Sequence, residues 1–338
     1  MKRGAIIGLG NIAVRGHLPA YLTDPLLRSS VEIVAVMDVV DQNREKSREL
    51  LPQAKFYTDL DQLLANERVE FADICAPPHT HAGFIEQCLR RKVHILCEKP
   101  LTQAASLVEP LVNAIREANV VFLPCHQYRY SPLWMSIRDI ITSGALGKVT
   151  LAQFNVFRMH ADSGTAAWNP EWRTDKSHSG GGILADTGTH YFYLTQFLFG
   201  VPRKISSVLK TLKHFNYPVE DTAIVVLEFE DKIVQLNLTW ASGSRANSIW
   251  IAGTEGALSY DGTVLRQTSG GEMRDIPMPD VSDKRQYVEW YASLFREFIR
   301  RIDAADLRHD FLEEAATVMK MLEASYRGEQ ELAPLDAY

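Results

Sequence analysis

The feature that most constrains this chain is a glycine-rich turn at its start, Gly8-Leu9-Gly10-Asn11-Ile12-Ala13, which directly follows a short apolar run. In a strand–turn–helix unit the first glycine permits the tight turn, and the second lets the backbone approach a bound pyrophosphate. A small third residue, here Ala13, lets the helix pack closely on the strand. Backbone amides at the start of the helix then form an anion site that needs no basic side chain. The turn therefore predicts a unit that binds a dinucleotide.

The first 124 residues repeat the alternation of strands and helices that such a unit requires. Short apolar runs recur at residues 4–8, 32–38, 71–76, 93–97 and 120–124, with amphipathic helical patterns between them. Near-continuous apolar strands separated by helices are typical of a parallel sheet that is covered on both faces. We therefore expect residues 1–124 to form a Rossmann-type, doubly wound dinucleotide-binding domain.

After Pro124 the pattern changes. At residues 233–240 every second side chain is apolar, which is the period of a half-buried antiparallel strand. Further β-rich segments lie at residues 149–158, 204–212 and 222–229. Two amphipathic helical patterns close the chain. We expect residues 125–338 to form a second domain on a mostly antiparallel sheet with one open face.

Composition excludes several classes of partner. The 36 basic and 42 acidic residues give a formal net charge of −6, which argues against nucleic acid and against a polybasic membrane surface. No run of about 18 apolar residues and no signal-peptide order is present. The four cysteines lack paired spacing and are expected to be buried thiols rather than disulfides or zinc ligands. These features favour a soluble, cytoplasmic protein.

Asp38 ends the second apolar run, about where a ribose-binding acid belongs. A carboxylate there accepts hydrogen bonds from the ribose 2′-hydroxyl of NAD and repels the 2′-phosphate of NADP. The alternative is an ordinary strand-end acid that caps the next helix. Given the glycine turn upstream, we favour the ribose role and expect NAD, while Arg44 nearby leaves NADP open.

Lys99 lies in a Glu98-Lys99-Pro100 turn directly after the apolar run at residues 93–97. The carboxyl ends of strands in such sheets face the ligand crevice, so Lys99 is expected near the nicotinamide end of a bound dinucleotide. Pro100 disfavours a helical conformation at Lys99. A lysine at a turn is otherwise most often a solvated charge, and only its position favours a role in the site.

Asp186 and His190 lie four residues apart, so on a helix they share one face. A carboxylate beside an imidazole can orient it and raise its pKa, which suits proton transfer near neutral pH. The pair alone favours a structural interpretation, with an N-cap aspartate and a buried histidine. A metal site is the weakest interpretation because no third ligand is evident, and we expect no metal.

Three motifs in this order, GLGNIA, EKP and GGGILADTGTH, resemble the Gfo/Idh/MocA family of oxidoreductases, which includes glucose–fructose oxidoreductase and inositol dehydrogenase. The stretches CAPPHTHAGFIEQCLRRKVHILCEKPL, HQYRYSPLWMSIRDIITSGALGKV and WRTDKSHSGGG extend the resemblance over most of the chain. It implies a Rossmann domain followed by an α/β domain with a large, mostly antiparallel open sheet. That second domain would bind substrate and form the oligomer contact.

The resemblance also implies roles for individual residues. His190 would take the proton from a reacting hydroxyl, Asp186 would orient that imidazole, and Lys99 would hydrogen-bond the same hydroxyl. The positions that match the family's dinucleotide contacts are Gly8, Gly10, Asn11, Ile12, Asp38, Ala76, Pro77, Glu98, Lys99, Trp172 and Arg173. One departure is Tyr193, which stands where many members carry a second aspartate, three residues after the histidine.

The implied function is an NAD(P)-dependent dehydrogenase or reductase. It would transfer a hydride between nicotinamide and a secondary alcohol or ketone of a sugar, cyclitol or related polyol. One alternative is a redox-neutral glycosidase that uses tightly held NAD. Another is a non-catalytic dinucleotide-binding regulator, which would need none of Lys99, Asp186 and His190. The open sheet face leads us to expect a homo-oligomer, either a dimer or a tetramer.

Overall fold

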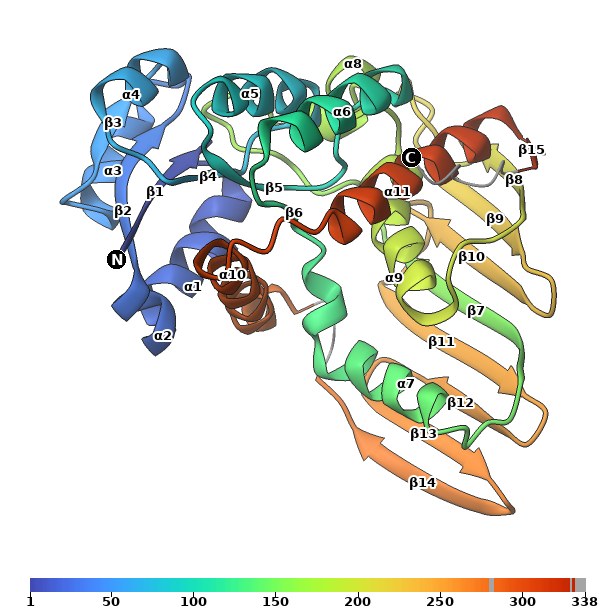
Figure 1. Ribbon diagram of the computed structural model, residues 1–338. Coiled ribbons are helices and arrows are strands. Elements are labelled where there is room, and N and C mark those ends of the chain that lie inside the picture. Colours follow the sequence, from blue (N-terminus) through green and yellow to red (C-terminus); the bar gives the residue numbers. More distant parts are fainter. Residues whose placement is uncertain (280–282, 329, 332–338) are drawn as a thin grey trace.

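The apolar runs of the N-terminal segment form one six-stranded sheet in the computed structural model, which describes residues 1–279, 283–328 and 330–331 (Figure 1). Its strands are β1 (Lys2–Ile7), β2 (Val31–Met37), β3 (Lys55–Tyr57), β4 (Phe71–Ile74), β5 (His94–Cys97) and β6 (Phe122–Pro124). Neighbouring strands pair in parallel in the order β3-β2-β1-β4-β5-β6. This is the doubly wound order, and it confirms the predicted Rossmann-type sheet.

Helices connect these strands, as the periodicity predicts. They are η1 (Ala13–His17), α1 (Leu18–Thr23), α2 (Pro25–Ser30), α3 (Asn43–Leu50), α4 (Leu60–Asn66), α5 (Pro78–Arg90), η2 (Ala105–Leu107) and α6 (Val108–Ala118). All four residues of β4 are buried, which explains why its sequence is apolar except for Asp73. The short edge strand β3 was not among the predicted runs.

The second sheet is larger. Its strands are β7 (Val149–Phe157), β8 (Lys204–Lys210), β9 (Thr222–Glu228), β10 (Ile233–Thr239), β11 (Ala246–Gly253), β12 (Gly256–Tyr260), β13 (Val264–Ser269), β14 (Glu272–Pro277) and β15 (Gln330–Glu331). Their order is β14-β13-β12-β11-β7-β10-β9-β8-β15, and among them only β7 and β10 pair in parallel. The predicted mostly antiparallel sheet is therefore confirmed.

Helices cover one face of this second sheet. Figure 1 shows α7 (Pro132–Thr142), α9 (Thr189–Phe199) and α11 (Asp310–Arg327) along that face. On β10 the side chains of Val234, Leu236 and Leu238 are buried, as their alternation predicts. On the other face, Val208, Ile224 and Trp250 are each more than two-fifths exposed.

The helix α10 (Tyr287–Asp303) returns to the first sheet. Its Phe298 meets Phe71 of β4 with ring centroids 5.7 Å apart, and its Phe295 stacks on Tyr21 of α1 at 4.5 Å. A C-terminal helix thus completes the cover of the N-terminal sheet. The division into domains at residues 124 and 125 stays a prediction, because this packing joins the two segments.

The remaining short elements are η3 (Gln127–Tyr130), η4 (Trp172–Thr174), α8 (Lys176–Ser179), η5 (Leu184–Gly188) and η6 (Lys284–Gln286). All four cysteines are buried free thiols, as expected. Within the described part of the chain, every helix is too short or too polar to cross a bilayer.

Candidate active site

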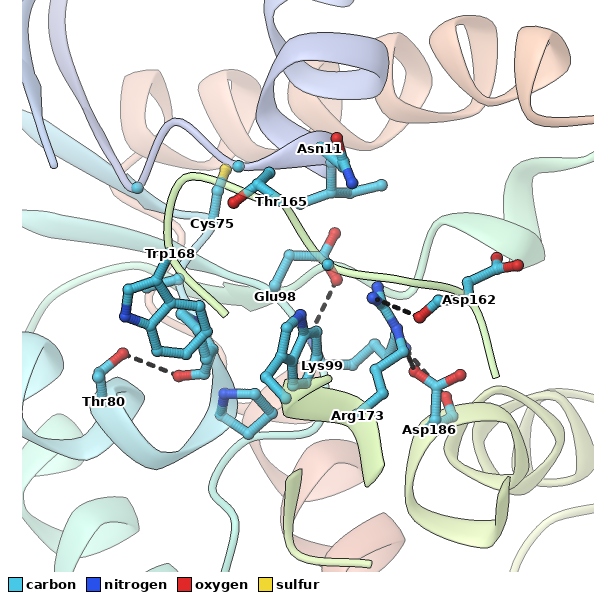
Figure 2. Close-up of a pocket in the computed structure, with 18 of the residues that line it drawn as sticks. Asn11, Cys75, Thr80, Glu98, Lys99, Asp162, Thr165, Trp168, Arg173 and Asp186 are labelled. Atoms are coloured by element: carbon cyan, nitrogen blue, oxygen red, sulfur yellow. Dashed lines mark hydrogen bonds and ion pairs between the residues drawn. The ribbon is translucent and has the colours of Figure 1, made fainter. Parts of the chain in front are cut away.

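The carboxyl ends of β1, β2, β4 and β5 open into a cavity of about 430 Å³. Every residue that the sequence analysis selected for cofactor binding or catalysis lines this cavity. They come from the first sheet's loops and from the helical segments beside the second sheet, and Figure 2 shows Asn11 and Cys75 on one side with Arg173 and Asp186 on the other. The structure thus brings the candidate residues together, while their individual roles stay predictions.

The glycine turn has the shape that a pyrophosphate cradle requires. Gly8 has a φ of +95°, and a Cβ there would lie 3.1 Å from the backbone of Cys75 and Ala76. At Gly10 an added Cβ would meet none of the described atoms within 4 Å, so space is left open beside the start of η1. Exposed backbone and free space at this turn fit a bound dinucleotide.

Asp38 links the end of β2 to the glycine turn. Its Oδ2 accepts a hydrogen bond from the amide of Leu9 at 2.7 Å, and its Oδ1 accepts one from the amide of Val40 at 2.8 Å. Each carboxylate oxygen can accept a second hydrogen bond, and the side chain lines the cavity. The Asp38 carboxylate can therefore hold the glycine turn and still accept the predicted hydrogen bond from ribose.

Lys99 and Asp186 meet across the cavity from distant parts of the chain. The Lys99 Nζ donates to the backbone carbonyl of Asp186 at 3.0 Å and lies 3.9 Å from its Oδ1. The Nε of Arg173 donates to that same Oδ1 at 3.3 Å (Figure 2). One carboxylate is therefore shared by two cations, which holds both of them at the cavity wall.

His190 is oriented by tyrosines and not by Asp186. Its Nδ1 lies 2.9 Å from the Tyr193 hydroxyl, which also accepts a hydrogen bond from the amide of Tyr128 at 3.2 Å. The Tyr128 ring stacks on the imidazole with centroids 4.2 Å apart. The expectation that the Asp186 carboxylate orients His190 is thus corrected by the hydrogen bonds of the described residues. Spacing on a helix face could not show that Arg173 and Lys99 take that carboxylate.

The pKa of His190 is held well below its ordinary value. Burial has the largest effect, and the positive charges of Lys99 and His126 add to it. The imidazole is therefore neutral at neutral pH. Its Nε2 forms no hydrogen bond with the described residues, which leaves this atom to face a ligand in the cavity.

A buried ionic cluster beneath the cavity was missed by the sequence analysis. His17, fully buried in η1, lies 2.8 Å from Asp73 and 3.0 Å from Glu98, and Tyr291 donates to the same Glu98 oxygen. Burial opposes the charged imidazole most strongly, but the combined effects of Asp73 and Cys75 outweigh it and raise the pKa of His17 well above its ordinary value. The cluster ties the helix after the glycine turn to the ends of β4 and β5, and so fixes the backbone just before Lys99.

A long loop from the second sheet covers the cavity. Trp168 and Trp172 lie on the segment between β7 and α8, and both line the cavity. The Trp168 ring lies parallel to His79 of α5 with centroids 6.1 Å apart, and the Arg173 guanidinium lies over the Trp172 ring at 4.3 Å. The loop thereby connects the second sheet to the edge of the dinucleotide crevice.

The fold and the cavity together define a two-sheet protein of the dinucleotide-binding class, with a cation pair and a neutral histidine at the reactive end of its crevice. Residues 2–126 match the oxidoreductase family with an NAD-binding Rossmann fold, and residues 134–259 match the GFO/IDH/MocA C-terminal domain. The matched regions cover about three quarters of the chain. The chain belongs to the Gfo/Idh/MocA oxidoreductase family.

Individual relatives are distant. An uncharacterized oxidoreductase of Schizosaccharomyces pombe is 28% identical over 67% of this chain, and the match spans 59% of that protein. The D-glucoside 3-dehydrogenase of Escherichia coli is 22% identical over 96% of this chain and 94% of its own length. The solved structure of levoglucosan dehydrogenase with NADH and L-sorbose has a TM-score of 0.87 at 17% identity and covers 100% of both chains.

Proposed function

We propose that this protein is an NAD-dependent dehydrogenase that acts on a secondary alcohol of a sugar, cyclitol or related polyol. The observation that carries the proposal is the convergence of Lys99 and the free Nε2 of His190 on the cavity that holds the glycine turn. A protein that only bound a dinucleotide would need neither group at that place. Similarity to a glucoside dehydrogenase and to a levoglucosan dehydrogenase supports a sugar or polyol as substrate.

His190 is the proton acceptor of this proposal. When Nδ1 donates its hydrogen to the Tyr193 hydroxyl, Nε2 is bare and takes the proton of the reacting hydroxyl. The low pKa keeps the imidazole in this neutral form before the reaction. In the reverse direction, the protonated Nε2 returns the proton to a carbonyl oxygen.

Lys99 stabilises the oxygen from which the proton leaves. Its ammonium group donates a hydrogen bond to that oxygen as negative charge develops on it. Asp186 is a positioning residue, because its backbone carbonyl and carboxylate hold Lys99 at the cavity wall. NAD, when bound, supplies the hydride acceptor.

The test is NADH formation from a panel of sugars, cyclitols and polyols by protein freed of co-purified cofactor. We expect NADH with at least one member of the panel, and loss of that signal in His190→Ala. NAD binding without NADH formation from any member would reject the proposed function. Cleavage of a glycoside with retained NAD and no net NADH would replace it with the redox-neutral alternative.

We also propose that the chain forms a homo-oligomer through the open face of its second sheet. Register places Val208 beside Ile224 on that face, and both are more than two-fifths exposed. Exposed apolar sheet surface of this kind favours a partner. Light scattering after size exclusion is the test, and a monomer at micromolar concentration would reject the proposal.

A further inference from the structure

One group of cavity residues has no part in the proposed proton transfer. Gln127, Arg158 and Tyr287 line the cavity with Tyr128, whose ring stacks on His190. The hydroxyls of Tyr128 and Tyr287 lie 2.5 Å apart. These residues therefore border the place where His190 would meet a substrate, and they are positioned to select it.

Arg158 directly follows β7, and the partners of its guanidinium among the described residues are neutral. Its Nη1 donates to the backbone carbonyls of Phe157 and Ala246 at 2.8 and 3.2 Å, and its Nη2 donates to the side-chain oxygen of Asn247 at 2.9 Å. These bonds fix the plane of the guanidinium. An arginine has five N–H donors, so Nε and one Nη2 hydrogen remain without an acceptor among the described residues.

The charge of Arg158 is not balanced by a described carboxylate. The Asp186 carboxylate is within 4.0 Å of Lys99 and Arg173, whereas Arg158 forms no ion pair in the described part of the chain. A partly buried cation without a counter-ion is costly, and the cost falls when an anion binds beside it. Burial raises the pKa of Tyr128 and Tyr287, and Arg158 is close enough to oppose that rise in both.

Gln127 supplies a second, independent observation. Its side chain is buried at 2% exposure, and its Oε1 has no hydrogen-bond partner among the described residues. Buried acceptors of this kind are rare in proteins and need a partner. The Oε1 atom is enclosed in this structure, and because Gln127 lines the cavity, a rotation of its side chain would bring it to a hydroxyl of a bound ligand.

We propose that the substrate is an acidic sugar or polyol, whose carboxylate binds Arg158 and one of whose hydroxyls donates to Gln127. This inference rests on the proposed dehydrogenase function and names the substrate class for the same cavity. A carboxylate matches the planar donors of a fixed guanidinium, and such a pair adds direction as well as attraction. A neutral sugar would leave the Arg158 charge as it is in the free protein.

The experiment compares two ligands that differ only at one exocyclic carbon. Methyl β-glucopyranosiduronate carries a carboxylate there, and methyl β-glucopyranoside carries a hydroxymethyl group; the matching galactosides form a second pair. Calorimetry on the complex of the protein with NADH measures binding of each ligand without requiring turnover. The variants are Arg158→Met, Arg158→Lys and the exposed control Arg203→Met, whose residue pairs with Glu230 on the surface.

We expect the acid of at least one pair to bind about 10-fold or more tightly than its neutral partner. Loss of a charge-assisted hydrogen bond predicts that Arg158→Met weakens binding of the acid by about 10- to 100-fold. Arg158→Lys should recover only part of that affinity, and Arg203→Met should match the wild type. The affinity for NADH should be the same in all variants, which would show that the substitutions leave the fold intact.

Equal or tighter binding of the neutral member in both pairs would overturn the inference, and so would no binding of either acid. Tighter binding of glucose 6-phosphate than of the uronoside would overturn the carboxylate assignment. Failure of the proposed function is separate. Oxidation of the neutral sugars together with no tighter binding of the acids would support the dehydrogenase and overturn this inference. Tighter binding of an acid without NADH formation from any sugar would support this inference and reject the proposed function.

Discussion

Tyr193→Phe removes a single oxygen, the one that contacts the Nδ1 of His190. The Tyr193 side chain is fully buried, and its ring stacks on His126 with centroids 4.1 Å apart, so phenylalanine preserves the packing. The lost oxygen bonds His190 at 2.9 Å and the amide of Tyr128 at 3.2 Å. Leaving a buried polar atom unsatisfied costs about 1–3 kcal/mol.

We therefore expect a loss of about 1–3 kcal/mol in unfolding free energy, measured by urea denaturation. If the same bond holds the imidazole in its reactive tautomer, kcat should fall by about 10- to 100-fold. NAD affinity should stay within about twofold, because no cofactor contact changes. Tyr217→Phe, away from the cavity, is the matched control. A stability loss with unchanged kcat would show that the Tyr193 hydroxyl is structural and would refute its role toward His190.

The remaining predictions concern the same cavity. His190→Ala and Lys99→Ala should each lower kcat by about 100-fold or more without changing the affinity for NAD. An equal loss of kcat and of NAD affinity would contradict the assigned roles. Asp38→Ala should weaken NAD binding in calorimetry and reduce the preference for NAD over NADP. If the affinities for NAD and NADP both stay unchanged, Asp38 does not contact the ribose. Gly10→Ala should weaken NAD binding with little change in unfolding free energy, since an added Cβ there meets none of the described atoms within 4 Å and would take up space left for the dinucleotide; normal NAD binding would reject the cradle. Because the pKa of His190 lies well below 6.5, kcat for alcohol oxidation should hold as pH falls through that value, and a midpoint at or above it would contradict the account. The unfolded chain protonates this histidine first, so its contribution to stability is lost as pH falls below 6.5.

Much of the fold could be predicted because its signals are local. The buried strands of the first sheet are nearly continuous apolar runs, and β10 alternates between apolar and polar residues from Val234 onward, so both patterns are visible in the sequence. The edge strand β3 has only three residues and is partly exposed, so it has no period to detect. The return of α10 to the first sheet depends on ring contacts between distant segments, which an amphipathic pattern alone does not assign to a partner.

The candidate site could be predicted only in part, because motifs are local and contacts between distant segments are not. Motifs mark Lys99, Asp186 and His190, but the partners of each side chain are set by tertiary packing. Asp186 and His190 share a helix face in the sequence, yet the aspartate contacts Arg173 and the histidine contacts Tyr193. His17 and Arg158 lie outside every motif that the sequence analysis quotes, and Gln127 lies in a quoted stretch but was given no role there. Their importance follows from burial, charge and unsatisfied donors or acceptors, which only the structure shows.

The most direct test of the central claim is transfer of isotope from substrate to cofactor. A sugar or polyol deuterated at the reacting carbon is incubated with the protein and NAD, and the NADH formed is analysed by mass spectrometry. The account predicts one deuterium in each NADH from the wild type, and formation of labelled NADH by His190→Ala that is slower by about 100-fold or more. Unlabelled NADH, or substrate conversion with no NADH at all, would contradict direct hydride transfer to NAD at this site.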